Sequence, residues 1–138
     1  MEIEGEKKKI LIVDDDNFLL DMYAFKFSQS DFEVHTALGG KQALQKLKEG
    51  LKPDVILMDI IMPEMDGFQM FEKINTEKLS ENSAKIILSN KGQKEDIDRG
   101  MSLGASGYIV KVNSTPVEVI DKVIKILAEK KTMQKPIN

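Results

Sequence analysis

Four apolar segments of this sequence end in residues that can do metal or phosphate chemistry. Asp14 and Asp15 follow the first segment, Asp59 follows a later one, and Ser89 and Lys111 close two more. The carboxyl ends of parallel strands meet at one edge of a sheet, which is where open α/β sheets bind their ligands. If these segments are parallel strands, the five side chains gather in one site.

Three carboxylates at one edge repel each other, by ~1 kcal/mol per pair at ~4 Å in water and ~4 kcal/mol at an intermediate dielectric. They need a cation, and ligation by oxygen alone favours Mg²⁺ or Mn²⁺. Mg²⁺ is commonly shared with a phosphate, whose other oxygens suit Lys111 and Ser89. An aspartate can also attack phosphorus and form an acyl phosphate. These residues indicate Mg²⁺-dependent phosphoryl transfer onto an aspartate, with Asp59 the most central.

The elements that position these residues alternate along the chain. Continuous apolar runs at 10–13 and 55–58 are typical of strands covered on both faces, and further strand signals lie at 33–37, 84–89 and 108–110. Helical spacing of apolar residues follows each strand: Leu19, Met22 and Tyr23; Ala43, Leu44 and Leu47; Phe68, Phe71 and Ile74; about 94–103; and a segment from Pro116. Five strands alternating with five helices predict an α/β fold, a doubly wound parallel sheet with helices on both faces.

The last helix has the clearest start. Thr115 and Glu118 are spaced as a capping box, and Pro116 takes the first helical position. Its apolar residues sweep roughly half of the circumference, wider than the ~100° stripe that one packing face needs. Either part of this arc faces a partner, or the helix lies deep between its neighbours.

Length and composition exclude several classes of protein. A chain of 138 residues predicts one domain, which we place at 9–129 between a disordered lead (1–8) and a polar tail (130–138). With 23 acidic and 20 basic residues, nothing suggests direct binding of nucleic acid. The absence of cysteine excludes disulfides and thiolate metal sites, and His35 is the only histidine. No apolar run approaches the ~18 residues of a membrane span, and 1–9 does not read as a secretory signal, so we expect a cytoplasmic protein without a membrane partner.

Together these motifs resemble the receiver domain of two-component response regulators. The resemblance is carried by Asp14-Asp15 after Ile-Leu-Ile-Val, by Met58-Asp59-Ile60-Ile61-Met62-Pro63-Glu64-Met65-Asp66-Gly67, by Ser89, and by Gly104-Ala105-Ser106-Gly107-Tyr108-Ile109-Val110-Lys111. It covers about residues 8–128 and is of the single-domain, chemotaxis-regulator kind. It implies a flavodoxin-like three-layer sandwich whose five strands are ordered 2-1-3-4-5.

The resemblance also implies a role for each site residue. Asp59 would accept the phosphoryl group from a phosphohistidine on a sensor histidine kinase or phosphotransfer protein, or from a small phosphodonor. Asp14, Asp15, Asp59 and the backbone carbonyl of Ile61 would hold Mg²⁺. Lys111 would pair with the phosphoryl group. No other cofactor is implied.

Two further residues would form the switch. Ser89 would hydrogen-bond the phosphoryl group, which makes Asp59, Lys111 and Ser89 the catalytic set, and Tyr108 would turn inward. The surface made by the fourth helix, fifth strand and fifth helix would then change for an output partner, and the same surface would serve a homodimer. A phosphate adds about −1.5 to −2 charges and three strong acceptors, which can bias such a two-state element.

One position departs from the family pattern, since Val112 stands where a proline usually follows the lysine. A cis bond costs ~2.5–4 kcal/mol before a residue other than proline. We therefore predict a trans Lys111-Val112 bond and a shifted 111–115 loop, which bears on the reach of Lys111. Asn90 and Lys91 flank the path of attacking water, so we expect them to affect the lifetime of the phosphoryl group.

Three neighbouring polar residues have simpler explanations. Asp16 is suited to cap the first helix, and Asp66 to shape the turn before the third. His35, in a weak strand, is expected to be a packed or surface residue.

Three other functions are alternatives to a phospho-accepting receiver. An FMN-binding module would need a Ser/Thr/Gly-rich phosphate loop where three aspartates stand. A Mg²⁺-dependent phosphatase would need a substrate pocket and a general acid beyond what the chain obviously supplies. A receiver-like interaction module that works without phosphorylation is the stronger alternative, because the Lys111-Val112 departure is compatible with it.

Overall fold

The computed structural model describes residues 6–134, with side chains to residue 130. The strands are β1 (Lys8–Asp14), β2 (Phe32–Leu38), β3 (Val55–Met58), β4 (Ala84–Ser89) and β5 (Gly107–Val110). The helices are α1 (Asn17–Gln29), α2 (Gly40–Lys48), α3 (Gly67–Thr76), α4 (Lys94–Ser102) and α5 (Pro116–Gln134), with a 3-10 turn, η1 (Lys111–Asn113), before α5.

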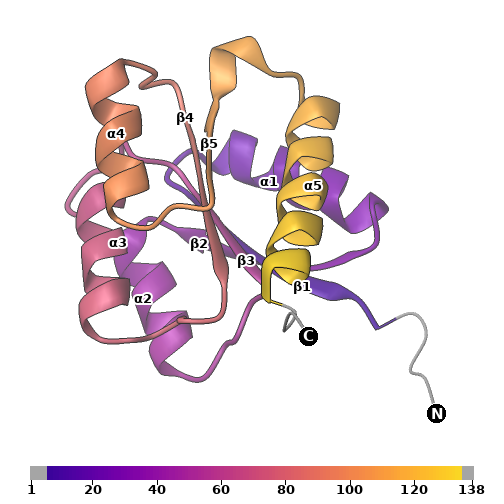
Figure 1. The fold of residues 1–138 in the computed structure, drawn as a ribbon, viewed down its shortest axis with the longest axis horizontal. Helices are drawn as coiled ribbons and strands as arrows, with labels where there is room; N and C mark the ends of the chain where they lie inside the picture. Colours follow the sequence, from indigo (N-terminus) through magenta and orange to yellow (C-terminus); the bar gives the residue numbers. More distant parts are fainter. Residues whose placement is uncertain (1–5, 135–138) are drawn as a thin grey trace.

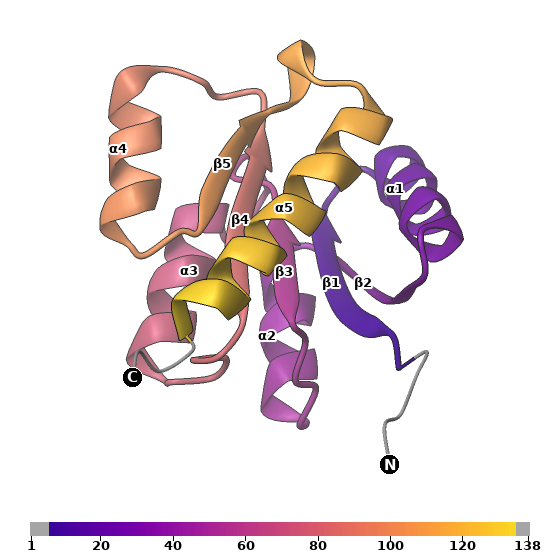
Figure 2. The same ribbon diagram turned by 45° about the vertical axis from the view of Figure 1, so that its right-hand side comes forward.

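All five strands are parallel, in the order β2-β1-β3-β4-β5. Helices α1 and α5 cover one face of the sheet, and α2, α3 and α4 cover the other (Figure 1). The turned view in Figure 2 shows the same three layers, with the sheet between the helices. The predicted doubly wound sandwich and its strand order are confirmed.

The core explains why the central strands are apolar throughout. Along β1, Ile10 and Ile12 pack toward α1 and α5, while Leu11 and Val13 pack toward α2 and α3. Side chains of a strand point alternately to the two faces, so a strand covered on both sides must be apolar at every position. β3 is buried along its whole length for the same reason.

Three helix starts follow directly from local sequence. The Asp16 carboxylate accepts the Leu19 N–H at 3.1 Å, so this residue caps α1 as predicted. Asp66 caps α3 through a capping box, and so shapes the turn before that helix. Thr115 and Glu118 exchange hydrogen bonds of 2.8 and 3.2 Å at the start of α5.

The two ends of the domain differ from the predicted bounds. β1 begins at Lys8, inside the predicted lead, and α5 runs to Gln134, beyond the predicted end at Glu129. The polar residues of 130–134 include good helix formers and can extend a helix that is already packed. Residues 1–5 and 135–138, which hold most of the predicted lead and the end of the predicted tail, lie outside the described residues.

Helix α5 buries only part of its wide apolar arc, so it does not lie deep between its neighbours. Val119 and Val123 are fully buried against the sheet, whereas Val117 and Ile124 keep 61% and 45% of their surface exposed. Part of the arc therefore packs and part stays open. Across 6–134, no helix combines the length and apolarity needed to cross a membrane.

Candidate phosphoacceptor and metal site

Three carboxylates meet where β1 and β3 end. Asp14 is the last residue of β1, Asp15 follows it, and Asp59 follows β3 beside it in the sheet. One oxygen from each lies within 4.8 Å of the others, and Asp14 and Asp59 are buried while Asp15 is exposed. The predicted cluster therefore exists, with one member open to solvent.

Lys111 directly follows the carboxyl end of β5, and its side chain reaches this cluster. Its Nζ donates to Asp14 Oδ2 at 2.9 Å and to Asp59 Oδ2 at 3.0 Å. Burial alone would lower the pKa of Lys111, but the two carboxylates outweigh it and raise that pKa. For Asp14, burial raises the pKa by more than the Asp16 N–H and Lys111 lower it.

The site keeps an excess of negative charge. Three carboxylates against one ammonium leave a net charge of −2 when all four groups are ionised. A divalent cation matches this charge, and the donors are all oxygens, which suits Mg²⁺. A cavity of about 300 Å³ opens beside Asp15, lined also by residues 38–41 and 63–64, so the exposed side of the cluster has room for ligands.

The backbone around Asp59 is fixed by a glycine that our sequence interpretation missed. Asp59 Oδ1 accepts the Ile60 N–H at 2.6 Å and the Ile61 N–H at 3.3 Å. The first residue of α3, Gly67, donates its N–H to Ile60 O at 2.8 Å. A Cβ on Gly67 would lie 2.2 Å from Asp59 O, so only glycine allows this approach. Local sequence shows a glycine in a turn but not the strand end against which it packs.

These contacts place Ile61 directly beside Asp59 through its backbone. The role of its carbonyl as a metal ligand stays a prediction, since the described contacts concern its N–H.

Ser89 and Tyr108 are joined through Lys91. Ser89 is fully buried at the end of β4 and pairs with Val110, the residue before Lys111. Its Oγ accepts the Lys91 N–H at 3.2 Å, and the Tyr108 hydroxyl donates to the Lys91 carbonyl. The two predicted switch residues thus hold the same residue of the β4–α4 loop.

The Tyr108 ring is partly buried and packs against the edge of the core on the α2–α3 side of the sheet. A Cβ on Gly100 of α4 would lie 3.1 Å from this ring, so that glycine leaves it room. Burial, together with the nearby charges of Asp96 and Asp59, raises the pKa of Tyr108 to about 12. The hydroxyl therefore keeps its proton at neutral pH and can donate a hydrogen bond to Lys91 O.

The loop that carries Val112 does not prevent Lys111 from reaching the carboxylates. No cis peptide bond occurs in the part of the chain that the structure describes, so the predicted trans bond is confirmed. The backbone continues from β5 into η1, and Val112 is 73% exposed.

The side chains of Asp16, Asp66 and His35 take no part in the cluster, although the Asp16 N–H donates to Asp14 Oδ1 at 3.0 Å. The two aspartates cap helices, and His35 Nε2 lies 2.7 Å from Glu33 Oε2 on the partly exposed strand β2.

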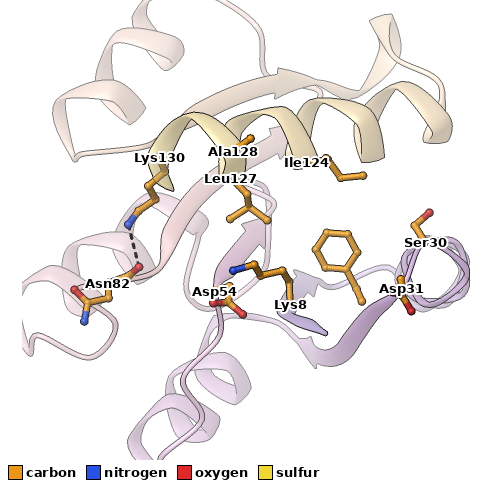
Figure 3. A pocket seen from close by; sticks show the side chains of 10 residues that line it. Lys8, Ser30, Asp31, Asp54, Asn82, Ile124, Leu127, Ala128 and Lys130 are labelled. Carbon is orange, nitrogen blue, oxygen red and sulfur yellow. Dashed lines mark hydrogen bonds between the residues drawn. The ribbon is translucent and has the colours of Figure 1, made fainter. Parts of the chain in front are cut away.

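A second cavity, of about 450 Å³, lies at the opposite edge of the sheet, between α5 and the start of β1 (Figure 3). It is lined by Phe32, Ile124 and Leu127 among others, and its two lysines, Lys8 and Lys130, are balanced by Asp31 and Asp54. This cavity therefore lacks the excess of charge that the cluster at the carboxyl edge has.

A five-stranded doubly wound sheet with an aspartate cluster and a lysine at its carboxyl edge defines an α/β protein with an acidic site at the end of its central strands. The comparisons agree. The family model "Response regulator receiver domain" matches residues 10–124, and the chain belongs to that family.

The relatives of this chain include both short and longer proteins. The chain is 38% identical over 121 residues to the chemotaxis protein CheY of Thermotoga maritima, covering 86% of this chain and 98% of that one. It is 35% identical over 120 residues to the alkaline phosphatase synthesis transcriptional regulatory protein PhoP of Bacillus subtilis, covering 87% of this chain and 48% of that one.

Among solved structures, a CheY-like response regulator receiver domain protein from Methanospirillum hungatei superposes with a TM-score of 0.83 at 30% identity, covering 93% of this chain and 99% of that one. The chain thus spans nearly all of the chemotaxis relative and about half the length of the transcriptional relative.

Proposed function

We propose that this receiver accepts a phosphoryl group on Asp59. The observation that carries the proposal is the placement of Lys111 between Asp14 and Asp59 in a cluster that keeps a charge of −2. An Asp59 oxygen bonds to phosphorus as the bond from phosphorus to the donor nitrogen of a phosphohistidine breaks. The product is an acyl phosphate on Asp59.

Asp14, Asp15 and Asp59, with the Ile61 carbonyl, would hold Mg²⁺ (or Mn²⁺). The bound ion supplies positive charge that offsets the negative charge of the incoming phosphoryl group. Lys111, whose raised pKa keeps it charged, turns from the carboxylates to a phosphoryl oxygen and stabilises it there.

The switch begins at Ser89, whose hydroxyl donates to a phosphoryl oxygen. Because Ser89 and Tyr108 both bond to Lys91, a shift of the serine changes the β4–α4 loop and the surface of α4, β5 and α5. That surface is the proposed contact for an output protein, and for a homodimer. The donor is a sensor histidine kinase or a phosphotransfer protein, and the expected location is the cytoplasm.

Intact mass after incubation with acetyl phosphate and Mg²⁺ tests this proposal. Wild type gains one phosphoryl group, whereas Asp59→Asn does not, and omitting Mg²⁺ or adding a chelator prevents the gain. Asp66→Asn is the matched control, because asparagine also caps a helix and Asp66 lies outside the cluster.

Small donors can be refused, so a phosphorylated histidine kinase domain is used as the second donor. If neither donor phosphorylates the folded protein, the proposal is wrong. A partner complex of equal affinity with wild type and Asp59→Asn then favours the alternative, an interaction module that works without phosphate.

A further inference from the structure

The open side of the acidic cluster lies between two walls that an exposed ion pair joins. The cavity of about 300 Å³ beside Asp15 is bounded by the start of α2 and by the β3–α3 loop, residues 59–66. Lys41 Nζ of α2 lies 3.3 Å from Glu64 Oε1 of the loop. Of the described residues that line this cavity, Lys41 is the only one with a cationic side chain.

The other side chains of the site are little exposed. Asp14 and Asp59 are buried, Ser89 is fully buried, and the side chain of Lys111 keeps only 11% of its surface exposed. Asp15 is the exposed member of the cluster. A phosphodonor from solvent therefore approaches on the Asp15 side, where it meets the Lys41–Glu64 pair.

This ion pair can open without disturbing the walls of the cavity. The two side chains keep 68% and 70% of their surface exposed, and an ion pair in contact with water contributes little to stability. The walls also meet elsewhere, since a Cβ on Gly40 would lie 3.2 Å from Met65 Sδ. Lys41 can therefore exchange Glu64 for an anionic ligand while the loop stays in place.

Phosphodonors differ in the charge of the group that leaves. When an Asp59 oxygen bonds to the phosphorus of acetyl phosphate, the bond from phosphorus to the acetyl oxygen breaks, and that oxygen keeps the electron pair as acetate. In phosphoramidate the nitrogen is protonated at neutral pH, so the same attack releases neutral ammonia. An ammonium group beside the leaving atom stabilises the developing acetate but not ammonia, whereas a carboxylate there favours the protonated nitrogen of the second donor.

We propose that Lys41 and Glu64 determine which class of phosphodonor this site prefers. Lys41 leaves Glu64 and stabilises the anionic leaving group of an acyl phosphate. Glu64 competes with that donor for Lys41, and it favours a donor whose leaving nitrogen is protonated. This inference rests on the proposed function, because it takes Asp59 as the phosphoacceptor.

Initial rates of phosphorylation by acetyl phosphate and by phosphoramidate test the proposal, both measured with Mg²⁺ by intact mass. Lys41→Met lowers the second-order rate constant for acetyl phosphate about three- to fivefold, the size expected for one exposed charge, and leaves that for phosphoramidate unchanged. Glu64→Gln shifts the ratio of the two rate constants the opposite way, toward acetyl phosphate. Both shifts shrink at high ionic strength, because the two charges are exposed to solvent.

Lys48→Met and Glu77→Gln are the matched controls. Lys48 Nζ lies 3.6 Å from Glu77 Oε1, so this pair also joins α2 to the end of α3, but neither residue lines the cavity beside Asp15. Neither control changes the ratio of the rate constants. Any change in metal affinity affects both donors alike and cancels in that ratio, and circular dichroism confirms that each variant is folded.

The outcomes separate this inference from the proposed function. If wild type accepts phosphate from no donor, a kinase included, both are wrong. Wild type that accepts phosphate from a kinase but from neither small donor overturns only the inference. So does an unchanged ratio in Lys41→Met, or a ratio that Lys48→Met shifts as much. Equal losses with both donors also overturn it, because they would show that Lys41 acts only by positioning the β3–α3 loop.

Discussion

Two lysines, Lys85 buried and Lys111 partly buried, lie near opposite edges of the sheet, in opposite electrostatic surroundings. At the carboxyl edge, Lys111 contacts two carboxylates, which raise its pKa against the effect of burial. Near the amino edge, Lys85 of β4 donates to the backbone carbonyl of Ser80, and burial lowers its pKa. Both cations are withdrawn from water, but only Lys111 has carboxylate partners.

The difference supports the proposal that the carboxyl edge is the one that reacts. Around Lys85, neutral hydroxyls and carbonyls satisfy one another: the Ser83 hydroxyl contacts that of Ser80 and donates to Pro53 O. Around Lys111, the carboxylates outnumber the cation, so further positive charge is favoured there. The excess of carboxylates around Lys111 therefore supports the proposed reactive site at the carboxyl edge.

The largest expected effect is on the rate of phosphoryl transfer, to which Lys111 contributes and Lys85 does not. Lys111→Met lowers the rate of phosphorylation by acetyl phosphate on the order of 100-fold, because it removes a charge that stabilises the transferring group. Lys85→Met leaves the rate unchanged. Rates are measured by intact mass per folded molecule. Equal rates in the two variants would show that the contact of Lys111 with Asp59 is structural only.

Removal of one carboxylate tests whether excess negative charge at the carboxyl edge binds a cation. Asp14→Asn weakens Mg²⁺ binding at least about tenfold, because it removes one anionic ligand from the cluster. Isothermal titration calorimetry measures the affinity. Asp16→Asn, two residues away, keeps its helix cap and binds Mg²⁺ like wild type. A similar loss in both variants would contradict a site built on Asp14.

The free energy of unfolding tests the role of Lys85 near the amino edge of the sheet. Lys85→Met is expected to change the free energy of unfolding by between zero and a gain of about 1 kcal/mol, since the release of a buried charge offsets the lost hydrogen bond to Ser80 O. Urea unfolding measures it. A loss of more than about 2 kcal/mol would mean that this hydrogen bond is essential to the fold.

The smallest effect is the pH dependence that Lys85 adds. Its folded pKa lies below the ordinary 10.5, so the folded chain releases this proton at lower pH than the unfolded chain does. The unfolded state then binds more protons, and this contribution to stability rises with pH from the lowered pKa up to 10.5. The advantage of Lys85→Met over wild type should therefore shrink as the pH approaches 10.5. An advantage that stays constant would refute the lowered pKa.

Features set by local sequence were predicted well. The helix caps at Asp16 and Thr115 and the turn at Asp66 depend on residues within three positions, and the central strands depend on continuous apolar runs. The gathering of Asp14, Asp59 and Lys111 followed from parallel topology alone. The true end of α5 was missed because polar residues give no apolar periodicity to follow.

Features set by distant backbone contacts were not predictable. Gly67 is needed because the end of β3 approaches it closely, and Gly100 lies beside the side chains of Ile87 and Tyr108; local sequence shows none of these neighbours. The burial of Lys85 depends on a carbonyl supplied by the loop before β4. Lys91 joins Ser89 to Tyr108 through its backbone, which its side chain does not reveal.

Chemical mapping of the modified residue tests the central claim most directly. The chain is incubated with acetyl phosphate and Mg²⁺, reduced with sodium borohydride, digested and sequenced by mass spectrometry. An acyl phosphate on Asp59 is reduced to homoserine, so we expect homoserine at position 59 and unchanged aspartates at positions 14, 15 and 66. Homoserine at another position, or a phosphate that resists borohydride, would contradict Asp59 as the phosphoacceptor.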